Sequence, residues 1–263
     1  MQRTEGLTSI VVVCYNNPPI TRRCIAAIER HSTSCELILI DNASPDGAGA
    51  VLEACVDRHI VVHNASNLGY APAVNQGIAL ARGDTIAILN NDVIVTPGWL
   101  DAMKLHCRPD QVVVPLSTAC YHGQEVQGVD VQVNDDELAR IAKDVRRANA
   151  DNCKTLNFAA GFCMLMDWRT LAEVGWLDPD LTLAADDFEF ALRMHRAGVR
   201  FALALGVVVL HLGHRAFASD PEHADAMASA SWLAFSRKYP NVLMSDFESE
   251  FRADGGPAYI YTP

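Results

Sequence analysis

Residues 67–92 read NLGYAPAVNQGIALARGDTIAILNND, and this stretch predicts a helix followed directly by a buried strand. The helix is expected over residues 71–81. Residues 85–89, TIAIL, form a short continuous apolar run, which is typical of a strand that is buried on both faces. The strand ends at Asn90-Asn91-Asp92, where polar residues appear that a core does not need.

The same alternation of strands and helices runs through the first 110 residues. Buried strands are predicted at 9–15 (SIVVVCY), 36–40 (ELILI) and 59–63, and helices at 21–30, 47–56 and 97–106. Alternation of this kind predicts an α/β fold with a mainly parallel central sheet, flanked by helices and connected by right-handed crossovers.

The second half of the chain is less regular. Strands are predicted at 111–115 and 199–210, and helices at 135–147, 168–174, 186–197 and 221–238. Residues 116–155 are otherwise polar and irregular. Because neither half looks complete, we predict one domain over residues 1–263.

Composition excludes several classes of function. The 263 residues include 21 Lys and Arg against 32 Asp and Glu, a net charge of −11, which argues against nucleic acid or an anionic bilayer as the main partner. The sequence contains no apolar run of membrane-spanning length and no secretory signal, so we expect a cytoplasmic protein without a transmembrane segment. The eight cysteines form no C-x-x-C pair and are expected to be free thiols.

Polar residues follow three of the predicted strands, at 15–17, 41–44 and 90–92. Each group alone is typical of an ordinary turn. Since the carboxyl ends of parallel strands meet at one edge, where ligands bind, the three groups together predict a binding edge. The first strand–helix junction lacks G-x-G-x-x-G and the chain has no P-loop motif, which excludes the usual dinucleotide and P-loop sites.

The order of motifs resembles the family 2 inverting glycosyltransferases, which have a GT-A fold. The resemblance covers residues 9–212 through the pieces SIVVVCYNN, LILIDNAS, residues 67–92, GFCMLMDWRTLAEVGWLDPDL, ADDFEFALRMHRAGVRF and a closing Leu210-His211. Within the family it looks most like the branch of rhamnosyl- and galactofuranosyl-type enzymes. The resemblance implies transfer of a sugar from a nucleotide diphosphate sugar, of UDP or dTDP type, to a hydroxyl acceptor in the synthesis of cell-surface polysaccharide or another glycan. It also implies a nucleotide-binding half (1–110), an acceptor and catalytic half (111–240), in which residues 116–155 shape the acceptor site, and a tail (241–263).

A donor diphosphate needs a local cation in a chain of this negative charge. The resemblance implies Mn²⁺ or Mg²⁺ at a D-x-D motif, which here reads Asn90-Asn91-Asp92, so that only one carboxylate remains. Asn90 can still offer a carbonyl oxygen to a hard cation. His211 is the expected further ligand; the alternative is a hydrogen-bonded histidine at a strand end.

The resemblance also implies a nucleotide site and a catalytic base. Asp41 is expected to accept a hydrogen bond from the base, and the other nucleotide-binding residues are Tyr15, Asn16, Asn67, Gly69, Asn75 and Asn91. Gly69 is expected to let the backbone approach the ligand, or else to form a plain turn. Asp187 inherits the role of general base, beside Asp186, which replaces the family's usual Glu; the alternative for both acids is capping of a helix. Trp176 and His214 are expected near the sugars.

Two other functions stay open. A nucleotidyltransferase has a similar fold, but it needs a basic residue in the first loop, where this chain has Asn and Pro. A nucleotide-sugar-binding module without catalysis is the second, and the incomplete D-x-D motif favours it.

Overall fold

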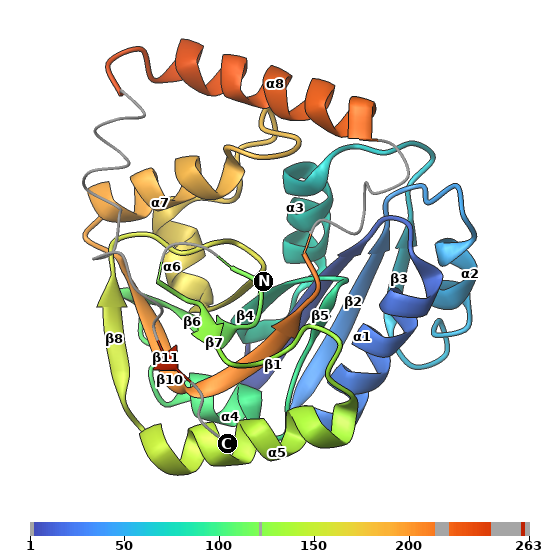
Figure 1. Cartoon of the computed structure of the whole chain (residues 1–263). Coiled ribbons are helices and arrows are strands. Elements are labelled where there is room, and N and C mark those ends of the chain that lie inside the picture. The colour runs from blue at the N-terminus through green and yellow to red at the C-terminus, as the bar shows by residue number, and fades with distance from the viewer. Residues whose placement is uncertain (1–2, 121–122, 214–220, 243–258, 261–263) are drawn as a thin grey trace.

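A nine-stranded sheet forms the centre of the computed structural model, which describes residues 3–120, 123–213, 221–242 and 259–260 (Figure 1). The order along the sheet is β3-β2-β1-β4-β9-β6-β10-β5, and β8 also pairs with β10. The strands are β1 (Thr4–Cys14), β2 (Cys35–Asp41), β3 (Ile60–His63), β4 (Gly83–Asn90), β5 (Val93–Ile94), β6 (Gln111–Ser117), β8 (Cys153–Leu156), β9 (Cys163–Asp167) and β10 (Arg200–His211). Strands β7 (Val126–Gln127) and β11 (Tyr259–Ile260) form a separate pair.

Six strands of the sheet run in the same direction. Strand β1 is parallel to β2 and β4, and β2 is parallel to β3. Because β9 is antiparallel to both β4 and β6, β6 and its parallel partner β10 point the same way as β1. The predicted mainly parallel sheet is therefore confirmed, and the six strands end at one edge, at Cys14, Asp41, His63, Asn90, Ser117 and His211.

Helices cover the sheet. They are α1 (Pro18–His31), α2 (Ala48–Glu53), α3 (Tyr70–Leu80), α4 (Trp99–Lys104), α5 (Asp135–Asn149), α6 (Trp168–Val174), α7 (Asp186–Arg196) and α8 (Pro221–Lys238). Helix α3 packs on β1 and β2, and α4 and α5 pack on β10. The approach of α3 to β1 is so close that a Cβ on Gly77 would lie 2.3 Å from a methyl carbon of Val11. Figure 1 shows α8 as the outermost helix, lying across α7.

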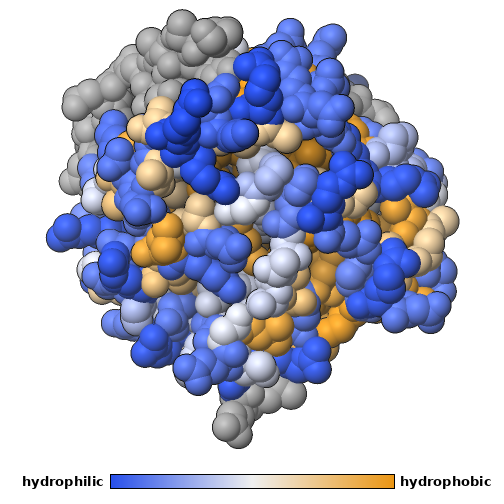
Figure 2. Space-filling view, turned by 90° about the horizontal axis from the view of Figure 1, so that it is seen from below, coloured by the Kyte–Doolittle hydropathy of each residue, from blue (hydrophilic) through white to orange (hydrophobic). Residues whose placement is uncertain are grey.

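The apolar core is one continuous cluster that extends from β1 to Phe235 in α8. The central strands contribute almost fully buried residues, which explains their uninterrupted apolar sequences. Hydrophilic side chains predominate on the face seen in Figure 2, where the view is from below, on the side of α5. Among the described residues, no helix combines the length and apolar character needed to cross a bilayer.

The sequence did not predict β9, which enters the middle of the sheet. Its residues are apolar and buried, but a run of five gives no periodicity that separates a strand from other buried segments. Residues 116–155 are also more regular than expected, because they include β7 and most of β8, which pairs with β10. Such pairing depends on a partner distant in sequence.

Candidate active site

Asp92 and His211 face each other at the edge where the parallel strands end. The chain reverses after β4, so that Val93 in β5 pairs with His211 at the end of β10, and the Leu212 N–H donates to the Asp92 carbonyl (3.1 Å). The Nε2 atom of His211 lies 3.4 Å from Oδ1 of Asp92, and both side chains are mostly buried. Two of the three residues predicted as metal ligands are thus brought together.

Hydrogen bonding fixes the tautomer of His211. Its Nδ1 lies 2.8 Å from the carbonyl oxygen of Ala119, which can only accept, so Nδ1 carries the proton. In the neutral imidazole, the lone pair is then on Nε2, the atom that faces Asp92. Phe162 stacks on the ring with centroids 4.7 Å apart and holds its orientation. This is the arrangement that protein metal sites use to orient a histidine ligand.

The residues around Asp92 fit a divalent cation held jointly with substrate. The described residues contain no group of three or more His, Cys, Asp and Glu side chains able to hold a metal. Mg²⁺-type ions are bound through one or two protein ligands together with substrate phosphates, and a pair is sufficient for that. The Oδ1 atom of Asn90 is buried and accepts no hydrogen bond from the described residues, as expected of an oxygen reserved for a ligand.

The acidic pair Asp186–Asp187 opens α7. The capping position before it belongs to Ala185, which offers no side-chain cap, and both Ala184 and Ala185 have a φ of 59°. Left-handed backbone at two consecutive alanines is strained and persists only where the surroundings impose it. Asp187 Oδ1 accepts a hydrogen bond from the Phe188 N–H (2.9 Å), so the pair does contact the helix N-terminus.

The two acids share one buried environment. Burial raises the pKa of both carboxyl groups, and the charge of Asp187 raises the pKa of Asp186 further. Backbone N–H groups favour the ionised form at both residues, those of Asp186 and Asp187 at Asp186 and those of Phe188 and Gly161 at Asp187. The pair therefore binds a proton more readily than exposed aspartates do and resists carrying two charges at once.

Tyr70 is a residue of this site that the sequence analysis missed. Its hydroxyl oxygen is buried and has no hydrogen-bond partner among the described residues. Burial raises the pKa of Tyr70, and the charges of Asp186, Asp187 and Asp92 raise it further, which places the phenol among the acids. Its position directly after Gly69, in the segment most specific to the family, was the available signal.

Asn91, which follows β4, is hydrogen-bonded to the loop that precedes α1 and contains Asn16. The Asn91 side chain donates to the Thr21 hydroxyl (2.8 Å) and to the Asn16 carbonyl (3.3 Å). Asn16 itself has left-handed backbone, with a φ of 61°, and is almost fully buried. Asn91 therefore connects the loop between β4 and β5, which contains Asp92, to the loop between β1 and α1, and it positions both loops. Tyr15 lies half-buried just before Asn16.

Asp41 is held by protein groups on both carboxylate oxygens. Oδ1 accepts from the Ser44 N–H (3.1 Å), and Oδ2 lies 3.0 Å from Nδ1 of His63, whose Nε2 contacts Glu53. These contacts raise the pKa of His63, the bond to Asp41 most strongly. A hydrogen bond from a base to Asp41 would have to use the remaining lone pairs, so that role stays a prediction.

Asn42 organises the loop that contains Asn67 and Gly69, and the sequence analysis missed it. Its side chain donates to Asn67 Oδ1 (2.8 Å) and to the Gly69 carbonyl (3.1 Å). Gly69 has a φ of 89°, and a Cβ there would lie 2.4 Å from Thr182. The close approach that requires glycine is thus to another part of the chain; the expected approach to a ligand finds no support here.

Asn75 positions the turn that contains Trp176. Its amide donates to the Leu177 carbonyl (2.8 Å) and accepts from the Leu177 N–H (3.1 Å). This use of the side chain leaves the expected nucleotide contact of Asn75 without support. The Trp176 side chain remains 45 % exposed on this fixed turn, as expected of a surface for stacking a sugar. His214 lies outside the described residues.

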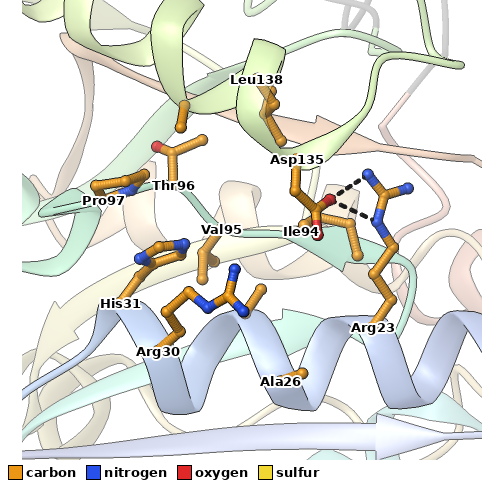
Figure 3. A pocket seen from close by; sticks show the side chains of 12 residues that line it. Arg23, Ala26, Arg30, His31, Ile94, Val95, Thr96, Pro97, Asp135 and Leu138 are labelled. Carbon is orange, nitrogen blue, oxygen red and sulfur yellow. Dashed lines mark hydrogen bonds and ion pairs between the residues drawn. The ribbon is translucent and has the colours of Figure 1, made fainter.

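A separate cavity of about 60 Å³ lies between α1, residues 94–97 and α5 (Figure 3). Arg23 on its wall is paired with Asp135, and Arg30 and His31 complete its basic side. None of the sequence-predicted site residues lines this cavity. We therefore place the functional site at the edge of the sheet.

The family assignment follows from the sequence that builds this edge. Residues 9–167 match the model of the family described as glycosyl transferase family 2. The chain belongs to glycosyl transferase family 2. The matched region contains Asp92 and ends before the acidic pair and His211.

Curated relatives agree with this family. Glycosyltransferase GlyG of Streptococcus pneumoniae is 32 % identical over 101 residues, which are 37 % of this chain and 34 % of GlyG. The uncharacterised glycosyltransferase EpsJ of Bacillus subtilis is 32 % identical over 40 % of this chain and 32 % of its own length. Succinoglycan biosynthesis protein ExoO of Rhizobium meliloti is 32 % identical over 36 % of this chain and 28 % of its own length. The chain thus spans about a third of these relatives.

Solved structures share the fold, which is GT-A. GalNAc-T7 with UDP, GalNAc and Mn²⁺ superposes with a TM-score of 0.61 at 16 % identity, covering 93 % of this chain and 57 % of that one. Mannosyltransferase PcManGT from Pyrobaculum calidifontis, in complex with GDP-Man and Mn²⁺, superposes with a TM-score of 0.57 at 17 % identity. The superposition covers 91 % of this chain and 77 % of that one. At these identities the likeness concerns the fold alone.

Proposed function

We propose that this chain transfers a sugar from a nucleotide diphosphate sugar to a hydroxyl acceptor with inversion at the anomeric carbon. The observation that carries the proposal is that two pairs of polar side chains lie near each other. Asp92 and His211 form one pair, and Asp186 and Asp187 form the other. Phe162 stacks on His211, and a Cβ on the preceding Gly161 would lie 3.4 Å from the Asp187 Cβ. A cation-binding pair beside a buried carboxylate base is what a direct displacement with a diphosphate leaving group requires.

Asp92, His211 and Asn90 would hold the divalent cation, Mn²⁺ or Mg²⁺. When bound, such an ion neutralises the diphosphate and stabilises the charge that develops on it as the sugar leaves. The His211 tautomer and the buried oxygen of Asn90 support this assignment. The two neighbouring structures that contain Mn²⁺ and a nucleotide or nucleotide sugar agree with it.

Asp187 would remove the proton from the acceptor hydroxyl. As the oxygen attacks the anomeric carbon, the bond to the diphosphate breaks and the proton passes to the Asp187 carboxylate. A pKa raised above the ordinary range of aspartate makes the carboxylate a stronger base. A proton on Asp186 would keep the pair from carrying two charges in one buried site.

The donor is proposed to be a UDP- or dTDP-sugar, and the product a cell-surface polysaccharide or other glycan. The relative ExoO, a succinoglycan biosynthesis protein, supports the product class. The two named neighbours were solved with UDP and with GDP-Man, so fold alone does not select the base. The rhamnosyl- and galactofuranosyl-type branch, a single domain over residues 1–263 and a cytoplasmic location stay predictions.

Donor hydrolysis tests this function without knowledge of the acceptor. The purified chain is incubated with UDP-, dTDP- and GDP-sugars in the presence of Mn²⁺, Mg²⁺ or EDTA, and the released nucleotide diphosphate is measured. We expect metal-dependent hydrolysis of at least one UDP- or dTDP-sugar, lost in Asp187→Asn and kept in the exposed control Asp57→Asn. Binding of nucleotide sugars without any release would indicate a binding module, and release of pyrophosphate from a nucleoside triphosphate with a sugar phosphate would indicate a nucleotidyltransferase.

A further inference from the structure

Glu189 is a buried carboxylate in α7, one turn after Asp186, and only 1 % of it is exposed. Arg193 Nε donates to both of its oxygens (2.7 and 2.9 Å), and a terminal nitrogen of the same guanidinium donates to Oε2 (2.8 Å). The Tyr239 hydroxyl donates to Oε1 (2.6 Å). The carboxylate thus joins α7 to a residue that follows α8.

The Arg193 guanidinium, which is bonded to Glu189, also fixes the turn that contains Gly175. Arg193 donates to the carbonyl oxygens of Val174 (2.6 Å) and Trp176 (2.8 Å). Gly175 between them has a φ of 89°, and a Cβ there would lie 3.3 Å from a terminal nitrogen of Arg193. The turn is therefore packed directly on the guanidinium, whose direction is set by Glu189.

The C-terminal half of α8 contacts the segment between this turn and the acidic pair. The Ser231 hydroxyl accepts from the Leu183 N–H (3.1 Å), and Lys238 is paired with the buried Asp178. Trp232 packs on Phe188, next to Asp187, with ring centroids 5.3 Å apart. Figure 1 shows α8 lying across α7, as these contacts require.

We propose that Glu189 is a positioning residue for sugar transfer: with Arg193 and Tyr239 it fixes residues 174–185, and thereby the placement of Trp176 and of the Asp186–Asp187 pair. The proposal rests on the proposed function of that pair. The contribution of the buried Glu189–Arg193 ion pair to stability does not by itself explain its presence, because well-packed apolar residues at such positions often stabilise a protein as much or more. The backbone of Ala184 and Ala185, just before Asp186, is strained and persists only where the surrounding structure imposes it. We therefore assign that role to the network of Glu189, Arg193 and Tyr239.

The test compares Tyr239→Phe and Glu189→Gln with the parent and with Glu173→Gln, an exposed control at the end of α6 beside the same turn. Tyr239→Phe removes one hydroxyl and keeps the ring, which packs against Phe235 and under Arg196, so this variant is expected to fold. Three quantities are measured: amide hydrogen exchange over residues 174–185, UDP affinity with Mn²⁺ by calorimetry, and kcat for hydrolysis of the nucleotide sugar that the parent cleaves fastest.

In both variants we expect exchange over residues 174–185 to become faster while UDP affinity stays within about twofold of the parent. The expected loss in kcat is roughly 10-fold for Tyr239→Phe and nearer 10²-fold for Glu189→Gln, since displacements of about 1 Å have costs of that order. Glu173→Gln should match the parent in all three measurements.

Unchanged exchange over residues 174–185, or faster exchange with parental kcat, would overturn the positioning role and leave the proposed function standing. A loss of UDP affinity that parallels the loss of kcat would also overturn it, because the effect would then not be confined to this segment. Failure of the proposed function has a different result: Asp187→Asn would hydrolyse donor at the parental rate, whatever the Glu189 variants do.

Discussion

His211 Nε2 lies 3.4 Å from Asp92 Oδ1, although one residue ends β10 and the other follows β4. Two ligands of one ion, each about 2.1 Å from it and at a right angle, are separated by about 3 Å. The arrangement of the two side chains is thus close to the spacing that a shared cation needs. The pairing of β5 with β10 sets this distance, so the site is built by the sheet itself.

Removal of the Asp92 carboxylate should abolish metal-dependent donor binding with little effect on stability. The mostly buried Asp92 side chain contributes a carboxylate and no apolar packing, so Asp92→Ala removes no hydrophobic contact. We expect no measurable UDP binding with Mn²⁺ by calorimetry and a melting temperature close to that of the parent. UDP binding as tight as in the parent would show that the cation site is elsewhere.

Uridine and thymidine diphosphates should bind more tightly than guanosine diphosphate. A pyrimidine ring N–H can reach the remaining lone pairs of Asp41, whereas a guanine must fit its larger ring system into the same space. Competition titrations with the three nucleotides in Mn²⁺ test this order. A preference for the guanine nucleotide would reverse the assignment of the base site.

Replacement of Asp186 by Asn should stabilise the protein at neutral and higher pH. Because burial raises the folded-state pKa of Asp186, the native state binds a proton that the unfolded chain has lost, and stability falls as pH rises from about 4 to the raised pKa. Asparagine avoids that loss. We expect Asp186→Asn to melt like the parent near pH 4 and at least ~2–4 °C higher at pH 8.5, about 1 kcal/mol for a chain of this size. Equal melting curves at pH 8.5 would contradict the raised pKa.

Tyr70→Phe should leave the free protein as stable as the parent or more so. The hydroxyl is buried without a partner among the described residues, and removal of an unsatisfied polar group is neutral or favourable. Chemical denaturation in the absence of nucleotide provides the measurement. A loss of more than about 1 kcal/mol would mean that the hydroxyl makes a stabilising hydrogen bond in the folded protein.

The sequence predicted the parts of the site that lie on single strands or at helix starts. The strand ends at Asp41 and Asn90, and the acidic pair at the start of α7, could be read from local patterns, because each is a break in an apolar run or the beginning of a helical one. These patterns also place them on a common edge once the sheet is known to be parallel.

The contacts that the sequence did not predict join distant segments. Asn75 was expected to contact the nucleotide, and only the folded chain shows that its side chain is bonded to Leu177. Asn42 looks like a turn former, and its contacts with Asn67 come from a loop that follows another strand. The sequence did not predict strand β9 for the same reason, because the strand is recognised only by its pairing with β4 and β6.

Single-turnover transfer by Asp187→Asn, measured beside Asp186→Asn and with melting curves for both, tests the central claim most directly. Asparagine keeps the size of the side chain and removes its basicity. We therefore expect donor affinity to survive in Asp187→Asn while turnover falls on the order of 10²–10⁴-fold, with a smaller loss in Asp186→Asn. An Asp187→Asn protein that melts early but transfers sugar at the parental rate would show that the acids only cap α7, and that Asp187 is not the base.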